Sequence, residues 1–463
     1  MFVFRALFLV SAMCVIAIYE LTLPIKYKVL AFIVGLPYLP VALVRAGFNR
    51  RRIMIVTVQH CGICFVKLGQ LLAMRHGLVG EDIADRLKSL LADLPPVNNA
   101  EILKVLRRNF NGLHRFKYIK PIPIATASIA QVYKGTLNTG EDVAIKVLKP
   151  NVYKQFETDM SLAKMVAKMI DRRLPKLRSL KLVDMMREFE ATISKEFMLI
   201  MEAASMDEFA EKMKGRLNGH VMPRVIWDMT TAEVLTMTWI DGENLSCASV
   251  GTLNSFSLDV REKLAEDFLN GFFEQTYGVG LFHADMHAGN IMLTTLGGVP
   301  KIALIDFGCT VLLQEKDRLY LASIFYAFVN RKYDYIAQLH NDAGYIDDSI
   351  DLRSFALSCR IIGEKFLQRP AGEINTSAML DEFLQVIQRL GIKSQPSLLF
   401  FQRSMMLSES IAKLLNPNID IWVVAKPWFA KWYSKNLTLD AVIKSKIKSF
   451  AGRVKKFAID GNL

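Results

Sequence analysis

Acidic and amide side chains recur at a defined spacing in one segment of the chain. Residues 283–290 read His-Ala-Asp-Met-His-Ala-Gly-Asn, and Asp306 begins the tripeptide Asp-Phe-Gly. Phosphoryl transfer needs one carboxylate to orient the attacking hydroxyl, an amide oxygen on a metal ion, and a second carboxylate that bridges metal and phosphates. Asp285, Asn290 and Asp306 provide these parts in that order. We therefore predict Asp285 as the catalytic carboxylate, with Asn290 and Asp306 as ligands of Mg²⁺.

The same segment could instead bind a metal ion directly. His283, Asp285 and His287 alternate along the chain, and all three are residue types that ligate zinc. That interpretation leaves Asn290 and Asp306 without a role, so phosphoryl transfer explains more of the segment.

An upstream hairpin is the candidate nucleotide site. Two β-rich runs flank Asn138-Thr139-Gly140, and the second contains Val-Ala-Ile-Lys146. The spacing is that of the nucleotide loop and strand lysine of protein kinases, in which backbone N–H groups cover phosphates. Alanines replace the glycines, and their Cβ atoms hinder close approach, so this loop must hold phosphates differently or more loosely. The predicted nucleotide-binding residues are Ala125, Ala127, Ser128, Ala130, Val132 and Lys146, and an ordinary alanine-rich hairpin is the alternative.

Two absences argue against a protein substrate. Ala284 stands where many protein kinases have arginine, and no Ala-Pro-Glu motif follows Asp306. A charged helix start at 314–317 leaves little room for an activation segment. A small or lipid-like acceptor is therefore favoured over a protein.

Together these motifs resemble the UbiB family of atypical kinase-like proteins, which is associated with ubiquinone biosynthesis. The resemblance covers residues 53–435 and includes the signature Lys67-Leu68-Gly69-Gln70. It implies binding of ATP and Mg²⁺, and a KxGQ helix that lies across the entry for a protein substrate. Lys67 and Gln70 would then lie over the active site.

The resemblance also assigns two acidic residues. Glu202 aligns with the glutamate that pairs with Lys146, and Glu196 aligns with the partner of Lys67. Met198 replaces an aspartate of the family. That replacement places the attachment of the KxGQ helix in doubt.

The hydrophobic pattern indicates the elements that position these residues. Helical periodicity over 153–173, 183–214 and 258–278 alternates with short β-rich runs, and the chain after 305 reads as helices. The fold class is α+β: a two-lobed protein-kinase-like fold with a helical N-terminal extension that bears the KxGQ motif and a mainly helical C-lobe. The expected domains are an N-terminal anchor (1–52), the KxGQ extension (53–120), an N-lobe (121–241), a C-lobe (242–435) and a basic tail (436–463).

Composition and charge point towards a membrane. Hydrophobic residues form 52% of the 463 residues, and the net charge is +13. Residues 2–19 and 29–45 are apolar runs that precede Arg50–Arg52, so one or two transmembrane helices are expected, with the rest of the chain on the cytoplasmic side. A cleaved signal peptide and a buried or interfacial helical hairpin are the alternatives.

The six cysteines are scattered and indicate a reducing compartment. Cys61 and Cys64 form the one Cys-x-x-Cys pair. It lies in helical sequence without a second such pair, which disfavours a redox or zinc role.

These observations predict a membrane-associated ATPase or small-molecule or lipid kinase that supports ubiquinone biosynthesis, located at a bacterial inner membrane. Its expected partners are membrane lipids and isoprenoid quinone precursors or quinone-biosynthetic enzymes, without nucleic acid, and a homodimer is left open. One alternative is a catalytically silent nucleotide-binding scaffold for those enzymes. Another is a Ser/Thr protein kinase.

Overall fold

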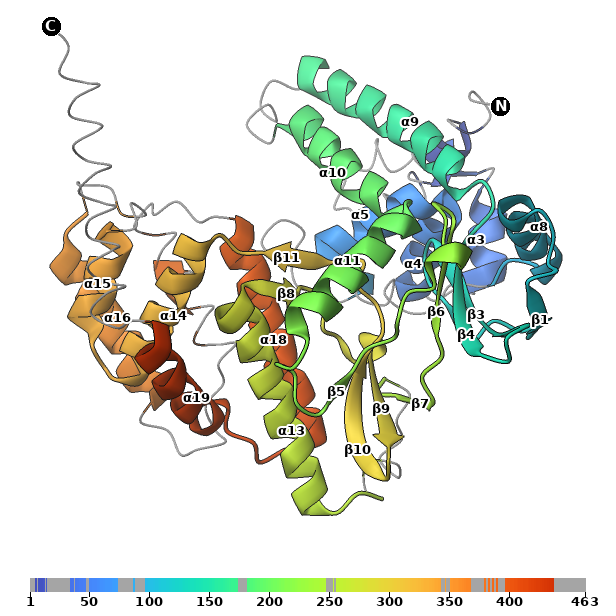
Figure 1. Ribbon diagram of the computed structural model, residues 1–463. Coiled ribbons are helices and arrows are strands. Elements are labelled where there is room, and N and C mark those ends of the chain that lie inside the picture. Colours follow the sequence, from blue (N-terminus) through green and yellow to red (C-terminus); the bar gives the residue numbers. More distant parts are fainter. Residues whose placement is uncertain are drawn as a thin grey trace, which may run out of the picture. The chain divides into compact units, whose positions relative to one another are not determined.

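The computed structural model contains two compact units (Figure 1). Residues Met1–Ala204 and Arg224–Trp239 belong to the first unit, and Ser205–Pro223 and Ile240–Leu463 belong to the second. The structure describes residues 34–36, 38–46, 50–73, 96–173, 181–246, 255–342, 350–367 and 396–436, together with 5, 7–12, 14, 86, 87, 253, 346, 379, 382, 383, 385, 386 and 389. The predicted basic tail from 437 onward lies outside this part of the chain.

A five-stranded antiparallel sheet forms the centre of the first unit. Its strands are β1 (Phe116–Ile119), β2 (Ala125–Thr126), β3 (Ala130–Leu137), β4 (Asp142–Leu148) and β6 (Val234–Thr238). They lie in the order β1-β3-β4-β6, with β2 paired to β3. The β3–β4 hairpin confirms the predicted β-rich pair, and Gly140 adopts a positive φ of 87° in its turn. Lys146 lies in register with Val132 on one side and Leu235 on the other.

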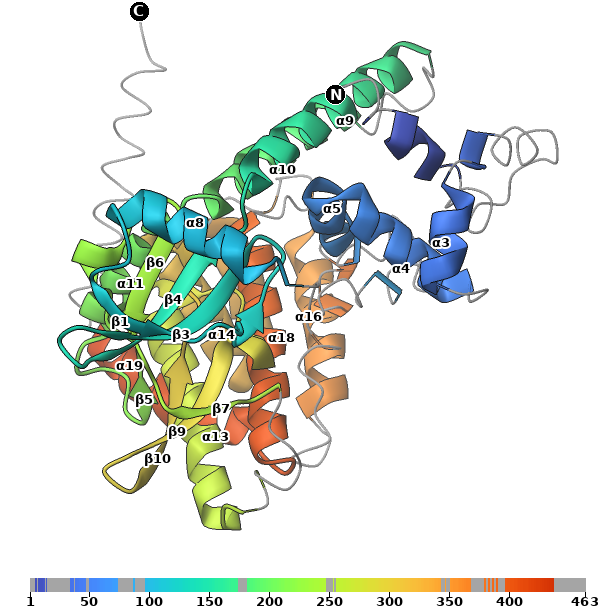
Figure 2. The same ribbon diagram turned by 90° about the vertical axis from the view of Figure 1, so that its right-hand side faces the viewer.

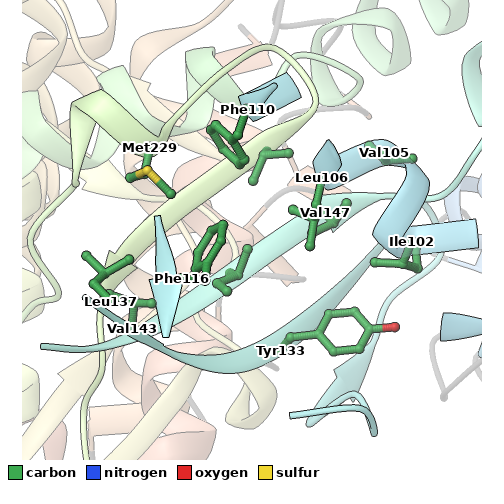
Figure 3. Close-up of a cluster of buried hydrophobic side chains, with 12 residues drawn as sticks. Ile102, Val105, Leu106, Phe110, Phe116, Tyr133, Leu137, Val143, Val147 and Met229 are labelled. Carbon is green, nitrogen blue, oxygen red and sulfur yellow. The ribbon is translucent and has the colours of Figure 1, made fainter. Parts of the chain in front are cut away.

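One face of this sheet is covered by α8 (Asn99–Phe110), as Figure 2 shows. The side chain of Asn98 caps the helix by accepting a hydrogen bond from the N–H of Ala100. Apolar side chains from the helix and strands form a buried core (Figure 3): Ile102, Val105, Leu106, Phe110, Phe116, Tyr133, Leu137, Val143, Ile145, Val147, Met229 and Val234. Because successive strand residues point to opposite faces, Lys146 points away from this core.

The remaining helices of the first unit are α3 (Leu39–Ala46), α4 (Arg50–Cys61), α5 (Ile63–Ala73), α9 (Val152–Arg173) and α10 (Leu182–Glu196), and α11 (Leu199–Met213) continues into the second unit. The antiparallel helices α9 and α10 lie side by side (Figures 1 and 2). The predicted helical stretch 183–214 is divided at Phe197. Beyond the break, the N–H of Leu199 donates to the carbonyl of Ala232 at 2.9 Å, which fixes the start of α11.

Parts of the two N-terminal apolar runs pack into the first unit. Leu9, Ala12, Tyr38, Ala42, Ile53, Cys61 and Leu162 form one buried cluster. Arg5 donates from Nε and Nη2 to the carboxylate of Asp159, at 2.7 and 2.8 Å, and Asp159 is fully buried in α9. Within the described residues, no helix has the length and apolarity to cross a membrane. The prediction of transmembrane helices in 1–52 is therefore not supported within the described residues. In these runs Leu9, Ala12, Tyr38 and Ala42 are buried, whereas other apolar side chains are 42–85% exposed: Leu7, Val10, Leu36, Val41 and Val44. The remainder of the runs lies outside the described residues.

The second unit contains two small sheets. In the first, β9 (Ile291–Leu296) and β10 (Val299–Leu304) form the predicted hairpin, β7 (Gly242–Asn244) pairs with β9, and β5 (His220–Val221) pairs in parallel with β10. In the second, β8 (Leu281–His283) pairs with β11 (Thr310–Leu312). This second pairing places the end of β8 beside the residues that follow Asp-Phe-Gly.

Helices form the rest of the second unit, as predicted for the chain after 305. They are α13 (Leu258–Phe273), α14 (Glu315–Val329), α15 (Tyr333–Asp342), α16 (Leu352–Leu367), α18 (Pro396–Leu415) and α19 (Ile421–Asn436). A π-helical turn, Glu274–Val279, extends α13 towards β8. The helices α13 and α18 run alongside each other (Figure 1), and ring contacts join Phe273 and Tyr277 to Phe429 of α19.

Candidate functional site

The first unit contains a buried ion pair on β4 and α11. Lys146 Nζ lies 2.6 Å from Glu202 Oε1, and the two side chains are only 10% and 8% exposed. The pairing is the one that the resemblance implied. A lysine held in this way presents an oriented positive charge that suits phosphate oxygens.

The alanine loop preceding β3 is a closed turn. The N–H of Ala127 donates to the carbonyl of Ala130 at 2.9 Å, and the N–H of Lys149 donates to Ile129 at 2.8 Å. The Ala127 amide therefore already has an acceptor within the protein. A phosphate that used this amide would have to replace the bond to Ala130.

The KxGQ residues lie on α5 in the first unit. Lys67 Nζ forms an ion pair with Glu196 Oε2 at the end of α10, again as the resemblance implied. Gln70 lies one turn further along α5 and is half-buried. Met198 is 47% exposed, so the position of the family's aspartate carries an exposed thioether here. The Lys67 pair forms without a carboxylate at 198.

Within the second unit, His283 connects the main chains of the two predicted acidic residues. Its ring is fully buried at the end of β8. Nδ1 accepts the N–H of Asp285 at 3.1 Å, and Nε2 contacts the carbonyl oxygen of Asp306. Burial lowers the pKa of His283, which favours the neutral ring with the proton on Nε2. The histidine thereby keeps Asp285 and Asp306 at a fixed spacing.

Two further hydrogen bonds orient the predicted metal ligands. Asn290 Nδ2 donates to the carbonyl oxygen of Asp285 at 2.9 Å. This bond uses the amide nitrogen, so the amide oxygen Oδ1 takes no part in it. The N–H of Gly308 donates to Asp306 Oδ1 at 2.9 Å. The second unit thus brings together Asp285, Asn290 and Asp306 through main-chain contacts. A carboxylate and an amide oxygen are suitable ligands for Mg²⁺.

The carboxylate of Asp285 has a partner from a distant helix. Arg403 Nη2 of α18 donates to Asp285 Oδ1 at 2.6 Å, across 118 residues of sequence. His287 Nε2 lies 3.8 Å from Oδ2, which is longer than a hydrogen bond. Asp285 is therefore held by both its main chain and its side chain.

Comparison with known proteins places these residues in a family. The model of the ABC1 atypical kinase-like domain matches residues 89–340, and the model of the UbiB helical domain matches residues 359–420. The chain belongs to the UbiB family. It therefore has the two-lobed, α+β kinase-like fold expected from the sequence.

Curated UbiB relatives match most of the chain. One from Azotobacter vinelandii, named a probable protein kinase UbiB, is 31% identical over 391 residues, which are 84% of this chain and 72% of the relative. A protein of the same name from Pseudomonas fluorescens is 30% identical over 424 residues, covering 91% and 79%. A solved structure from Mycobacterium tuberculosis, described as a complex of Rv3197 with erythromycin, is 19% identical, covers 87% of this chain and 97% of its own, and has a TM-score of 0.48.

The metal-site alternatives have no structural counterpart in the described residues of this UbiB protein. Within them, no three His, Cys, Asp or Glu side chains gather as a set of metal ligands. Burial raises the pKa values of Cys61 and Cys64 to about 12, so both thiols are protonated and unreactive at neutral pH.

Three residues have a setting in the structure that the sequence does not predict. The sequence offers His283 only as a zinc ligand in the alternative metal site, although its place two residues before Asp285 is a usable signal. Lys149 directly follows β4, which carries Lys146, and burial lowers the pKa of Lys149 to about 8. No local sequence pattern marks Arg403, because its partner Asp285 lies 118 residues away and only the fold brings the two side chains together.

Proposed function

We propose that this UbiB protein uses Mg-ATP, either hydrolysing it or transferring its terminal phosphoryl group to a small or lipid-like acceptor, in support of ubiquinone biosynthesis. The observation that carries the proposal is the buried ion pair between Lys146 and Glu202. Isolating two charges from water is costly, and such a pair is expected where an oriented cation has a task. The names of the relatives as probable protein kinases support phosphoryl transfer as the reaction class.

The residues of each unit have distinct tasks in this proposal. Lys146, oriented by Glu202, binds phosphate oxygens. Asn290 and Asp306 hold Mg²⁺, which when bound neutralises charge on the phosphates. Asp285 orients the attacking hydroxyl or water and accepts its proton. His283 keeps the main chains of Asp285 and Asp306 at a fixed spacing.

A nucleotide titration tests the assignment of Asp306. Asp306→Asn should reduce the thermal stabilisation that Mg-ATP or Mg-ADP confers on the full-length protein, because a neutral amide is a weaker magnesium ligand. Asp267→Asn, in the same unit on α13, is a matched control. Equal nucleotide affinity in wild type and Asp306→Asn would contradict the proposal.

Two observations bear on the alternatives. The Ala127 amide is already hydrogen-bonded to Ala130, which favours the catalytically silent nucleotide-binding scaffold. The helix α14 begins at Glu315, soon after Asp306, and leaves little chain for an activation segment. That shortness disfavours a Ser/Thr protein kinase.

We also propose that the protein associates with a membrane, and one face of α9 supports this. Met165, Val166 and Met169 are 53%, 42% and 55% exposed, and Lys168 and Arg172 are exposed among them. Exposed apolar side chains interleaved with basic ones suit an anionic lipid surface. The net charge of +13 favours the same surface.

Vesicle binding tests the membrane proposal. Met165→Ser combined with Met169→Ser should weaken flotation of the full chain with phosphatidylglycerol vesicles more than Met201→Ser, a control methionine that is 54% exposed on α11. Binding to phosphatidylcholine vesicles should be weaker throughout. Identical flotation of both variants would exclude this face of α9.

A further inference from the structure

Arg403 is carried by a helix that packs along α13. It lies on α18, where its neighbour Ser404 is fully buried. At the end of the same helix, Arg261 Nε of α13 donates to the carbonyl oxygen of Leu415 at 2.7 Å. The helix belongs to the segment that matches the UbiB helical domain, outside the match to the kinase-like domain. A family-specific helix therefore delivers a cation to Asp285.

The contacts of Asp285 divide into two groups. His283 and Asn290 bind its main-chain N–H and carbonyl oxygen, so they fix the backbone and leave the side chain free to rotate. Arg403 alone among the described partners makes a hydrogen bond to the carboxylate. It therefore sets the rotation of the carboxylate and occupies one of its two oxygens.

We propose that Arg403 is a positioning residue for phosphoryl transfer: by holding Oδ1 of Asp285, it presents Oδ2 to the attacking hydroxyl or water. This inference rests on the proposed function. In the step, the attacking oxygen bonds to the terminal phosphorus of ATP, the bond from that phosphorus to the bridging oxygen breaks, and ADP leaves with that electron pair. The proton of the attacking group passes to Oδ2 and then to solvent.

The chemistry of arginine suits this task. A guanidinium is charged at all working pH values and donates along fixed directions from a planar fork, whereas an ammonium is a point charge. The side chains of Arg403 and Asp285 are 35% and 31% exposed. A pair with that exposure contributes little to stability, so its removal should affect orientation more than folding.

The test is steady-state ADP release by the full-length protein and three variants. Arg403→Ala should lower kcat by about 10- to 100-fold, the range expected when a reacting group is misplaced by about 1 Å. The KM for ATP should change by less than about threefold, because the proposed role of Arg403 is to orient the Asp285 carboxylate and not to bind the nucleotide. Arg403→Lys should recover part of kcat. Lys212→Ala removes an exposed ion pair with Glu208 on α11 and should leave kcat within about twofold.

Two further readouts separate positioning from a structural role. Millimolar methylguanidinium should restore part of the kcat of Arg403→Ala, since it can replace the missing group at a partly exposed site. In an Asp285→Asn background, Arg403→Ala should cause no further loss, because both changes remove the same function. A further loss there, or an Arg403→Ala protein as active as wild type, would overturn the role of Arg403 alone. Wild-type protein without any turnover would overturn the proposed function and this role with it.

Discussion

The ion pair of Lys146 with Glu202 and the ion pair of Asp285 with Arg403 differ in their exposure to water. In the first unit, Lys146 and Glu202 are about nine-tenths buried, whereas in the second unit Asp285 and Arg403 are each about one-third exposed. Loss of one partner from a buried pair leaves an unpaired charge in a poorly solvated place, while water can replace a lost partner at an exposed pair. The first pair therefore combines a role in stability with one in function. The second can be altered with an effect that is mainly kinetic.

Breaking the buried pair should have the largest effect on stability. Glu202→Ala is expected to lower the free energy of unfolding by about 3–5 kcal/mol, because Lys146 would remain buried without its carboxylate. Urea denaturation followed by circular dichroism measures this change. Arg403→Ala is the comparison variant, with an expected loss of less than about 1 kcal/mol. Equal losses in the two variants would remove the distinction between the pairs.

A buried neutral group in the second unit extends the comparison to pH. His340 packs against Tyr320 and Phe355, and burial lowers its pKa from 6.5 to about 4. In the unfolded chain, His340 binds a proton as the pH falls below 6.5. In the folded chain, it binds that proton only as the pH falls to about 4. From pH 7 to pH 5, this histidine should decrease the free energy of unfolding by about 2 kcal/mol. His340→Gln should show a smaller decrease over the same interval, measured by urea denaturation at both pH values.

The ion pair between Lys67 and Glu196 is intermediate, with side chains 15% and 30% exposed. Lys67→Met should reduce the free energy of unfolding by about 1 kcal/mol, less than Glu202→Ala and more than an exposed pair. Thermal denaturation at equal protein concentration provides the ranking. Lys212→Met, which breaks an exposed pair with Glu208 on α11, is the control. A loss larger than that of Glu202→Ala would reverse the proposed order.

A substitution in the alanine loop should have the smallest effect on the free energy of unfolding. Ala127→Gly removes a Cβ from a turn whose amide already has an acceptor, so ATP affinity should change by a few-fold while stability falls by less than about 1 kcal/mol. Isothermal titration with Mg-ATP and Mg-ADP measures nucleotide preference. Cellular quinone content in a strain that carries only this variant distinguishes an enzyme from a scaffold. Altered binding with normal quinone would favour the scaffold. No change in either would exclude the loop from the nucleotide site.

The local features of the fold could be predicted from the sequence, and the long-range pairings could not. The β3–β4 hairpin follows from alternating apolar residues around Gly140, and the helices follow from their periodicity. The pairing of β5 with β10, by contrast, joins distant segments and has no local pattern. Arg403 was missed for the same reason. The packing of Leu9 in one cluster with Tyr38 and Ala42 also has no local pattern, because an apolar run has the same composition whether it meets lipid or a protein core.

The central claim is that Asp285 serves in phosphoryl transfer and not in nucleotide binding. The most direct test measures ADP release from Mg-ATP by full-length wild type and Asp285→Asn, together with the nucleotide affinity of both. The account predicts Mg²⁺-dependent release by wild type, a loss of about 100-fold or more in Asp285→Asn, and unchanged affinity for Mg-ADP. Equal rates of ADP release in the two proteins would contradict it.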